Sequence, residues 1–230
     1  MKKIISLTLI LLTATLAFSQ KIVDRRRKLT SRVTERYHAI IGDKKEIREG
    51  TYTATYTYKE IVIAQGQYKD DKKTGIWHFF NRDGSPTEDF DYDNNRLIDE
   101  STEDTTSNFR YRLEIELKPT DKATKPIKIG GRYFGYIPYL QLCRFPVDVS
   151  AGNSFHRVQL ELLISPLGRI AQYKAHIYVN GDDIVSYIDT DKLREEDKSF
   201  IPATLNGTPI TSTIIIQCYT AGYDETDMMN

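Results

Sequence analysis

The sequence has 230 residues, of which 40% are hydrophobic and 28% charged, and its 32 basic side chains are balanced by 32 acidic ones. This apolar content excludes a long disordered chain, and the lack of a basic excess argues against a nucleic-acid binder that depends on phosphate contacts. The 15 tyrosines and 9 phenylalanines, together with many β-branched residues, favour a mainly β or α+β fold. The length suits one or two domains.

Residues 1–19 have the pattern of a secretory signal peptide. Two lysines precede an apolar stretch over residues 4–18, and Ala17 and Ser19 place small residues where signal peptidase prefers them. This stretch is shorter than the roughly 20 apolar residues of a transmembrane helix. We therefore expect cleavage, export to the periplasm of a Gram-negative bacterium, and no integral membrane span in the mature chain. Removal of residues 1–19 leaves 30 basic and 32 acidic side chains, so the mature chain is slightly acidic.

The mature chain keeps two cysteines, Cys143 and Cys218. An exported protein enters an oxidising compartment in which a Cys143–Cys218 disulfide can form. Cys218 belongs to an apolar strand pattern, where a cysteine also serves as a small buried hydrophobe. Of the two interpretations we favour free thiols and keep the disulfide as the alternative.

Residues 20–98 form the first predicted unit, a β-rich region. It opens with the basic run over residues 25–28, which we interpret as a solvated arm rather than a contact for an anionic surface. Residues 51–58 read TYTATYTY, the strict period-2 alternation of a strand with tyrosines on one face. Between residues 66 and 95, polar turns that contain glycine separate short aromatic strands.

The strand over residues 76–80 has apolar side chains on both faces. Trp77 and Phe79 point one way, while Ile76 and Phe80 point the other. This pattern predicts hairpins stacked against each other in a repeat array. We interpret the aromatic residues of this region as the packing of the repeat itself rather than as a binding surface.

The spacing of these residues resembles the MORN-type repeat of the YwqK-like antitoxin family. The matching features are Gly66-x-Tyr68, Lys73-Thr74-Gly75-x-Trp77-x-Phe79-Phe80, Asp83-Gly84 and Tyr92-Asp93-Asn94-Asn95, with a weaker copy over Glu49-Gly50-Thr51-Tyr52-x-x-Tyr56. The resemblance implies β-hairpin repeats. It implies little about activity.

Residues 99–108 read DESTEDTTSN and form a predicted acidic linker, because the segment contains no apolar residue. The acidic stretch from Glu88 to Asp104 lacks the spacing of a calcium-binding loop, so we interpret it as a solvated face rather than a calcium site.

Residues 109–230 form the second predicted unit. Residues 158–164 alternate as a strand, Ser165-Pro166-Leu167-Gly168 makes a hairpin turn, and residues 169–179 return as the partner strand. A short helix is expected within residues 137–145. A second helix is expected from Asp182-Asp183 to about Leu193, since an aspartate can cap its first turn. The last strand spans residues 211–219.

This order resembles the carboxy-terminal domain of the TonB energy-transducer family. The matching features lie within residues 125–220 and are Phe145-Pro146, Gly168, Phe200-Ile201-Pro202-Ala203, Asn206-Gly207-x-Pro209-Ile210 and the terminal TSTIIIQCY. The resemblance implies a β-β-α-β domain whose last strand binds an extended peptide. The expected architecture is therefore MORN-like β-hairpin repeats followed by a TonB-C-like domain.

An exposed edge strand offers unpaired main-chain groups to which an extended peptide can add. In the last predicted strand, the candidate partner-binding residues lie on one face and are Thr211, Thr213, Ile215, Gln217 and Tyr219. The alternative is that residues 109–118 cover this strand, or that both of its faces belong to the core.

No enzyme motif is visible, and we assign no catalytic, cofactor-binding or metal-binding residue. None of the four histidines has the spacing of a metal ligand set. The sequence thus predicts a non-catalytic envelope protein that acts by protein–protein interaction, with peptide strand addition as the candidate mode of binding. Two alternatives stay open: a TonB-type transducer component anchored by an uncleaved amino-terminal helix, and an envelope hydrolase with an unfamiliar site.

Overall fold

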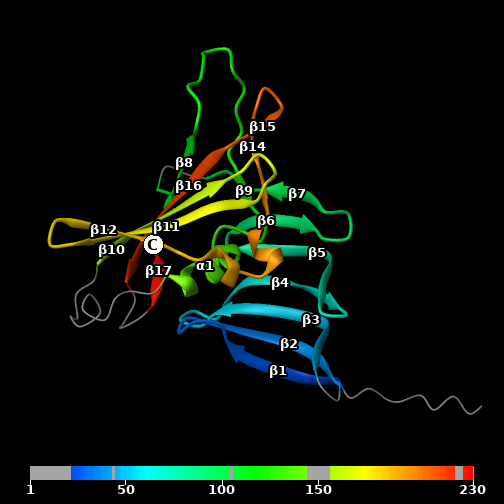
Figure 1. Cartoon of the computed structure of the whole chain (residues 1–230). Coiled ribbons are helices and arrows are strands. Elements are labelled where there is room, and N and C mark those ends of the chain that lie inside the picture. Colours follow the sequence, from blue (N-terminus) through cyan, green and yellow to red (C-terminus); the bar gives the residue numbers. More distant parts are fainter. Residues whose placement is uncertain (1–21, 43–44, 104–105, 144–155, 221–224, 230) are drawn as a thin grey trace, which may run out of the picture.

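The computed structural model describes residues 22–42, 45–103, 106–143, 156–220 and 225–229. Strands dominate it, with few and short helices, which confirms the mainly β, α+β class (Figure 1). The segment over residues 1–19, interpreted as a signal peptide, lies outside the described residues. Within the described ranges, no helix is both long and apolar enough to cross a membrane.

The first sheet, which we call the meander sheet, contains seven antiparallel strands in sequence order. Each strand pairs with the strands that precede and follow it in the chain, so every connection is a hairpin. The strands are β1 (Ile22–Lys28), β2 (Val33–Ile41), β3 (Glu46–Tyr56), β4 (Ile61–Lys69), β5 (Lys72–Phe80), β6 (Pro86–Asp91) and β7 (Arg96–Glu100).

One face of the meander sheet packs against the core. Trp77, Phe79 and Phe90 point into the core and are at most 2% exposed, whereas Ile76 on the opposite face is 48% exposed. The strands lie side by side in a single layer, and the repeat array of stacked hairpins stays a prediction. The interpretation of the inward aromatic residues as packing agrees with their burial.

Trp77 packs directly on the backbone of Gly66 in the neighbouring strand. A Cβ atom added at Gly66 would lie 2.3 Å from the indole ring. The indole Nε1 also donates a hydrogen bond of 3.1 Å to the carbonyl oxygen of Gln67. The ring thus occupies the space that a side chain at position 66 would need, which explains why glycine and tryptophan occur together here.

The second sheet, which we call the assembled sheet, combines three strands that are consecutive in sequence with others that are distant from them. Its order is β12-β11-β10-β16, and the far side of β16 pairs with β17 along one part and with β8 along another. The strands are β8 (Phe109–Leu113), β10 (Arg157–Ile164), β11 (Ile170–Val179), β12 (Asp182–Tyr187), β16 (Ser212–Thr220) and β17 (Thr226–Met228). The predicted hairpin turn over residues 165–168 joins β10 and β11 as expected.

The helix predicted from Asp182 to about Leu193 is wrong. Asn180 and Gly181 both have positive φ, 52° and 93°, and form a two-residue hairpin turn that returns the chain along β11 as β12. Asparagine followed by glycine is the sequence typical of this turn. Two short 3-10 turns follow, η2 (Thr190–Lys192) and η3 (Glu195–Lys198).

A short helical segment lies between the two sheets (Figure 1). It comprises the 3-10 turn η1 (Phe134–Tyr136) and the helix α1 (Ile137–Leu142), which confirms the short helix expected here. The Phe134 ring contacts Phe79 of the meander sheet at 5.9 Å between centroids, and Tyr139 contacts Tyr173 of the assembled sheet at 5.6 Å. Both sheets consequently contribute to one continuous hydrophobic core.

Two pairs of very short strands complete the described fold. They are β9 (Ile127–Lys128) with β13 (Phe200–Ile201), and β14 (Ala203–Leu205) with β15 (Thr208–Ile210). The chain passes from the meander sheet to the assembled sheet between Glu100, the last residue of β7, and Phe109, the first of β8. The division into units over residues 20–98 and 109–230 stays a prediction.

Candidate functional site

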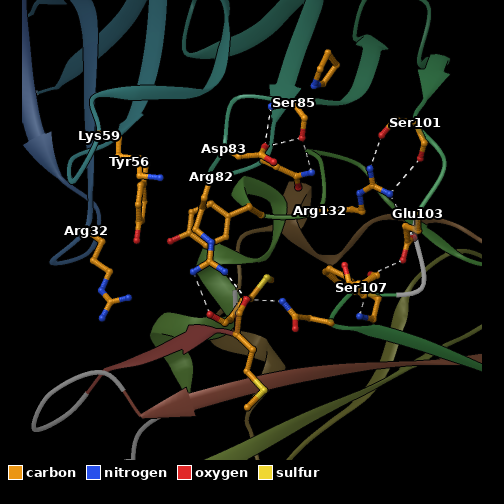
Figure 2. Close-up of a pocket in the computed structure, with 18 of the residues that line it drawn as sticks. Arg32, Tyr56, Lys59, Arg82, Asp83, Ser85, Ser101, Glu103, Ser107 and Arg132 are labelled. Carbon is orange, nitrogen blue, oxygen red and sulfur yellow. Dashed lines mark hydrogen bonds and ion pairs between the residues drawn. The ribbon is translucent and has the colours of Figure 1, made fainter.

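A groove of about 1190 Å³ lies where the turns of the meander sheet meet the end of the assembled sheet (Figure 2). The turns β3–β4 and β5–β6 form one wall. The segment that leads from β7 to β8 and residues Met228 and Met229 form the other. Its lining includes four basic side chains, Arg32, Lys59, Arg82 and Arg132, and two acidic ones, Asp83 and Glu103. The lining of the groove therefore carries more basic than acidic side chains, whereas the 32 basic and 32 acidic side chains of the whole chain balance.

Two of the groove's arginines are held by Asp227 of β17, which is only 4% exposed. Its carboxylate lies 2.9 Å from Arg32 Nη1 and 3.6 Å from Arg82 Nη1, and it accepts a 3.2 Å hydrogen bond from the Tyr133 hydroxyl. Burial, and after it the neighbouring Asp227 carboxylate, raises the pKa of the Tyr133 hydroxyl. This arrangement ties the β1–β2 and β5–β6 turns of the meander sheet to the end of the assembled sheet.

Arg82 also fixes the end of the described chain. It donates a 3.1 Å hydrogen bond to the carbonyl oxygen of Met228 and another to that of Met229. Its guanidinium lies 5.0 Å from the centroid of the Tyr133 ring, a cation–π geometry. Arg82 thus holds Met228 and Met229, which line the groove, in place.

The opposite wall contains Glu103, from the predicted acidic linker. Its side chain is 12% exposed and accepts hydrogen bonds from the Tyr111 hydroxyl at 2.6 Å, the Ser107 hydroxyl at 2.9 Å and the Lys125 ammonium. Burial alone would raise the pKa of Glu103, but these hydrogen bonds outweigh it and lower the pKa. Arg132 donates to the carbonyl and hydroxyl oxygens of Ser101 beside it. Here the segment is packed and ion-paired rather than a solvated face.

The rim of the groove carries the side chains that are least engaged by the protein. Tyr58 is 83% exposed at the β3–β4 turn. Lys59, also exposed, forms no ion pair with any described residue, although Asp83 lies close enough to feel its charge. The rim therefore exposes an aromatic ring and an ammonium group, while the arginines deeper in the groove hold its shape.

The strand predicted to bind a partner has no free edge. Along its whole length β16 pairs with β10, and on its other side Ser212–Ile216 pair with β8 and Cys218–Thr220 with β17. The premise of an open edge for Thr211, Thr213, Ile215, Gln217 and Tyr219 is therefore wrong. The alternative, in which residues 109–118 cover this strand, describes what β8 does. Partner binding by these five residues stays a prediction without that premise.

The side chains of the predicted residues are engaged within the protein. The Thr213 hydroxyl donates to Glu114 at 2.7 Å, and Gln217 donates to Gln159 at 3.1 Å. The Tyr219 hydroxyl accepts a hydrogen bond from Arg32. Tyr219 is thus the one member of the set connected, through Arg32, to the groove.

A pair of buried charged residues, which the sequence did not point to, lies at the junction of the sheets. Glu88 in β6 is 3% exposed and accepts a 2.8 Å hydrogen bond from the Gly130 N–H, and Lys128 is 4% exposed. Burial raises the pKa of Glu88 to about 7 and lowers the pKa of Lys128 to about 8. The pairing of Gly130 with Glu88 spans 42 positions in the chain, so no local pattern could reveal it.

The cysteines and histidines are placed as follows. Cys143 and Cys218 are both free and buried, and burial raises the pKa of each thiol. His38, His78 and His176 each lie within hydrogen-bond distance of a single neighbouring aspartate. Within the described ranges, no group of three or more His, Cys, Asp or Glu side chains is arranged to hold a metal ion.

In comparisons with known proteins, no family model and no curated protein matches the sequence of this chain. Among solved structures, a glycoside hydrolase aligns with 90% of this chain at 12% identity and a TM-score of 0.14. The chain spans 59% of the length of that enzyme. A TM-score this low does not indicate a shared fold.

Proposed function

We propose that this chain is a non-catalytic protein of the bacterial cell envelope that acts by binding another protein at the groove between its two sheets. The observation that carries the proposal is that some side chains of the groove are bonded within the protein while others are exposed at its rim. Arg82 and Arg132 are hydrogen-bonded to the walls, whereas Tyr58 and Lys59 project from the rim and make no such bond with another described residue. Export, and the resemblance to MORN-type and TonB-C-type modules, belong to this proposal and rest on the sequence patterns given above.

The chemistry of the groove favours a polypeptide partner with an acidic group. The lining carries four basic and two acidic side chains. Serine, threonine and asparagine residues make up most of the remaining lining, together with three tyrosines and two methionines. Tyrosine, methionine and arginine are residue types that are enriched in protein interfaces. An acidic side chain of the partner would meet Lys59, and an apolar one would rest on Tyr58.

The test is site-specific photo-crosslinking in envelope preparations, with a benzophenone amino acid at position 58. We expect one discrete protein adduct, and we expect Lys59→Glu in the same chain to reduce its yield strongly, because the reversed charge repels an acidic partner. The matched control carries the benzophenone at position 167, since Leu167 is 88% exposed and does not line the groove. The same adducts from positions 58 and 167, or no adduct from position 58, would contradict the proposal.

A further inference from the structure

The two sheets differ in how their outermost strands are protected. β1 pairs only with β2, and β12 pairs only with β11 within the described part of the chain. An unprotected edge strand invites pairing with another strand, and charged side chains are the usual defence. β1 has this defence, because residues 25–28 are four consecutive exposed basic side chains.

β12 lacks this defence over most of its length. Ile184, Val185 and Tyr187 are 39%, 43% and 69% exposed, and the charges of the strand are confined to its first two residues, Asp182 and Asp183. An edge strand with exposed apolar residues on both faces and no proline or internal charge is a site for β-strand pairing.

The core-facing side of β12 ends an apolar row that runs across the assembled sheet. Cys218 pairs with Val158, Val158 with Ile177, and Ile177 with Ile184. The first three are at most 1% exposed, whereas Ile184 is 39% exposed. The row therefore stops at an uncovered isoleucine, and one more strand would complete it.

The register of β12 fits a second copy of the same strand. In an antiparallel pair of identical strands, a two-fold axis perpendicular to the sheet relates the two copies. Directly paired residues point to the same face, so the axis must place one residue opposite its own copy rather than opposite the next residue along the chain. With the axis at Ile184, this residue lies opposite its own copy. Asp182 then lies opposite Ser186 of the second copy, and Asp183 opposite Val185. No two like charges face each other, whereas a parallel pair in register would set aspartate beside aspartate.

We propose that β12 is a homodimerisation edge, at which two copies of this chain pair antiparallel about Ile184 and join their assembled sheets into one. The isologous contact uses the same edge of both copies, so the assembly closes at two. A single strand pair buries less than the roughly 1,200–2,000 Å² of a stable interface. We therefore expect reversible, concentration-dependent dimers. The proposal is independent of the groove and its partner.

Sedimentation equilibrium of the chain from residue 20 onward tests the assembly. We expect a monomer–dimer equilibrium, which Ile184→Lys weakens by about tenfold or more because it sets two ammonium groups against each other. Leu167→Lys, at a surface position outside the edge, is expected to leave the dimer constant unchanged. A monomer at every accessible concentration, or an equal effect of both variants, would overturn the proposal.

Cysteine crosslinking tests the register and separates a second copy from a foreign strand. Under mild oxidation, Ile184→Cys is expected to form a disulfide-linked dimer of the purified protein, because the two positions are directly opposite. Leu167→Cys serves as the control for random collision, since both native cysteines are buried. If position 184 crosslinks no faster than position 167 in purified protein, the edge does not pair with its own copy.

Discussion

The meander sheet and the assembled sheet use the same antiparallel pairing but draw their neighbours from different distances in the chain. Every strand of the meander sheet pairs with the strand next to it in sequence. In the assembled sheet, Ile216 of β16 lies between Leu160 of β10 and Phe109 of β8. Local turns therefore dictate the first sheet, whereas the second depends on contacts between distant segments.

The two sheets nevertheless share a core, and this has a consequence for stability. Phe134 and Tyr139, on consecutive turns of one helical segment, contact different sheets. Damage to the locally determined sheet should consequently reach the other one, and three substitutions measure how closely the two are linked.

The largest effect is expected from Gly66→Ala in the meander sheet. The added methyl group would lie 2.3 Å from the Trp77 ring, so we expect a loss of about 3 kcal/mol in the free energy of unfolding. Urea unfolding followed by Trp77 fluorescence and by far-UV circular dichroism measures it. Trp77 is the only tryptophan, so its fluorescence reports on the meander sheet alone.

A shared core predicts that both probes shift together in Gly66→Ala. Separate transitions would show that the sheets unfold independently. The control is Gly207→Ala, where an added Cβ meets nothing within 4 Å. Because φ at Gly207 is 82°, which is unfavourable for alanine, the only expected cost of this control is backbone strain of about 1 kcal/mol.

The next effect concerns Glu88 at the junction and depends on pH. Its pKa is raised to about 7 in the folded protein from an ordinary value of 4.5, so its contribution to stability is fully present below 4.5 and is lost as pH rises through 7. Glu88→Gln cannot ionise. We expect it to match the wild type near pH 4 and to exceed it by roughly 2–3 kcal/mol at pH 8.

Urea midpoints at pH 4, 5.5 and 8 measure this difference. A constant offset between Glu88→Gln and the wild type at all three values would show that the carboxyl group keeps the same pKa in the folded and unfolded chain, contrary to its burial at the junction.

The smallest of the three effects is expected from Asp227→Asn. The change removes the charge that pairs with Arg32 and Arg82. Because the Arg32 side chain is 34% exposed and its charge is partly screened by water, we expect a loss of only about 2 kcal/mol in the free energy of unfolding. Thermal unfolding measures it. The control is Asp24→Asn. Asp24 pairs with His38, but the Asp24 carboxylate is 89% exposed, so the thermal midpoint of this variant should not change measurably. Equal midpoints for the two variants would argue that Asp227 does not link the sheets.

Much of the fold could be predicted from local patterns. The alternation of TYTATYTY as far as Tyr56, the turn that contains Gly84 and the hairpin at residues 165–168 correspond to observed strands and turns, whereas Gly66 and Gly75 lie within strands. The helix expected after Asp182 failed because an aspartate can cap a helix or follow a hairpin turn. The preceding Asn180-Gly181 pair was the stronger indication.

The candidate site was less predictable. Arg32, Arg82 and Asp227 meet although 195 positions separate Arg32 from Asp227. The sequence showed each as an ordinary charged residue in or beside a strand. Binding at the edge of the last strand was expected from the resemblance to the TonB carboxy-terminal domain, with coverage by residues 109–118 as the alternative. In the described structure β8 and β17 cover β16, and β12 is an outermost strand of this sheet.

By itself, the sequence determined the strand-forming segments, most of their turns and the inward face of the aromatic strands, because hydrophobic alternation and turn residues act within a few positions. Only the tertiary structure decided which strands became edges, which charges were buried and where the groove lies. These features depend on free energies gained when distant segments exclude water together, and no short stretch of sequence contains that information.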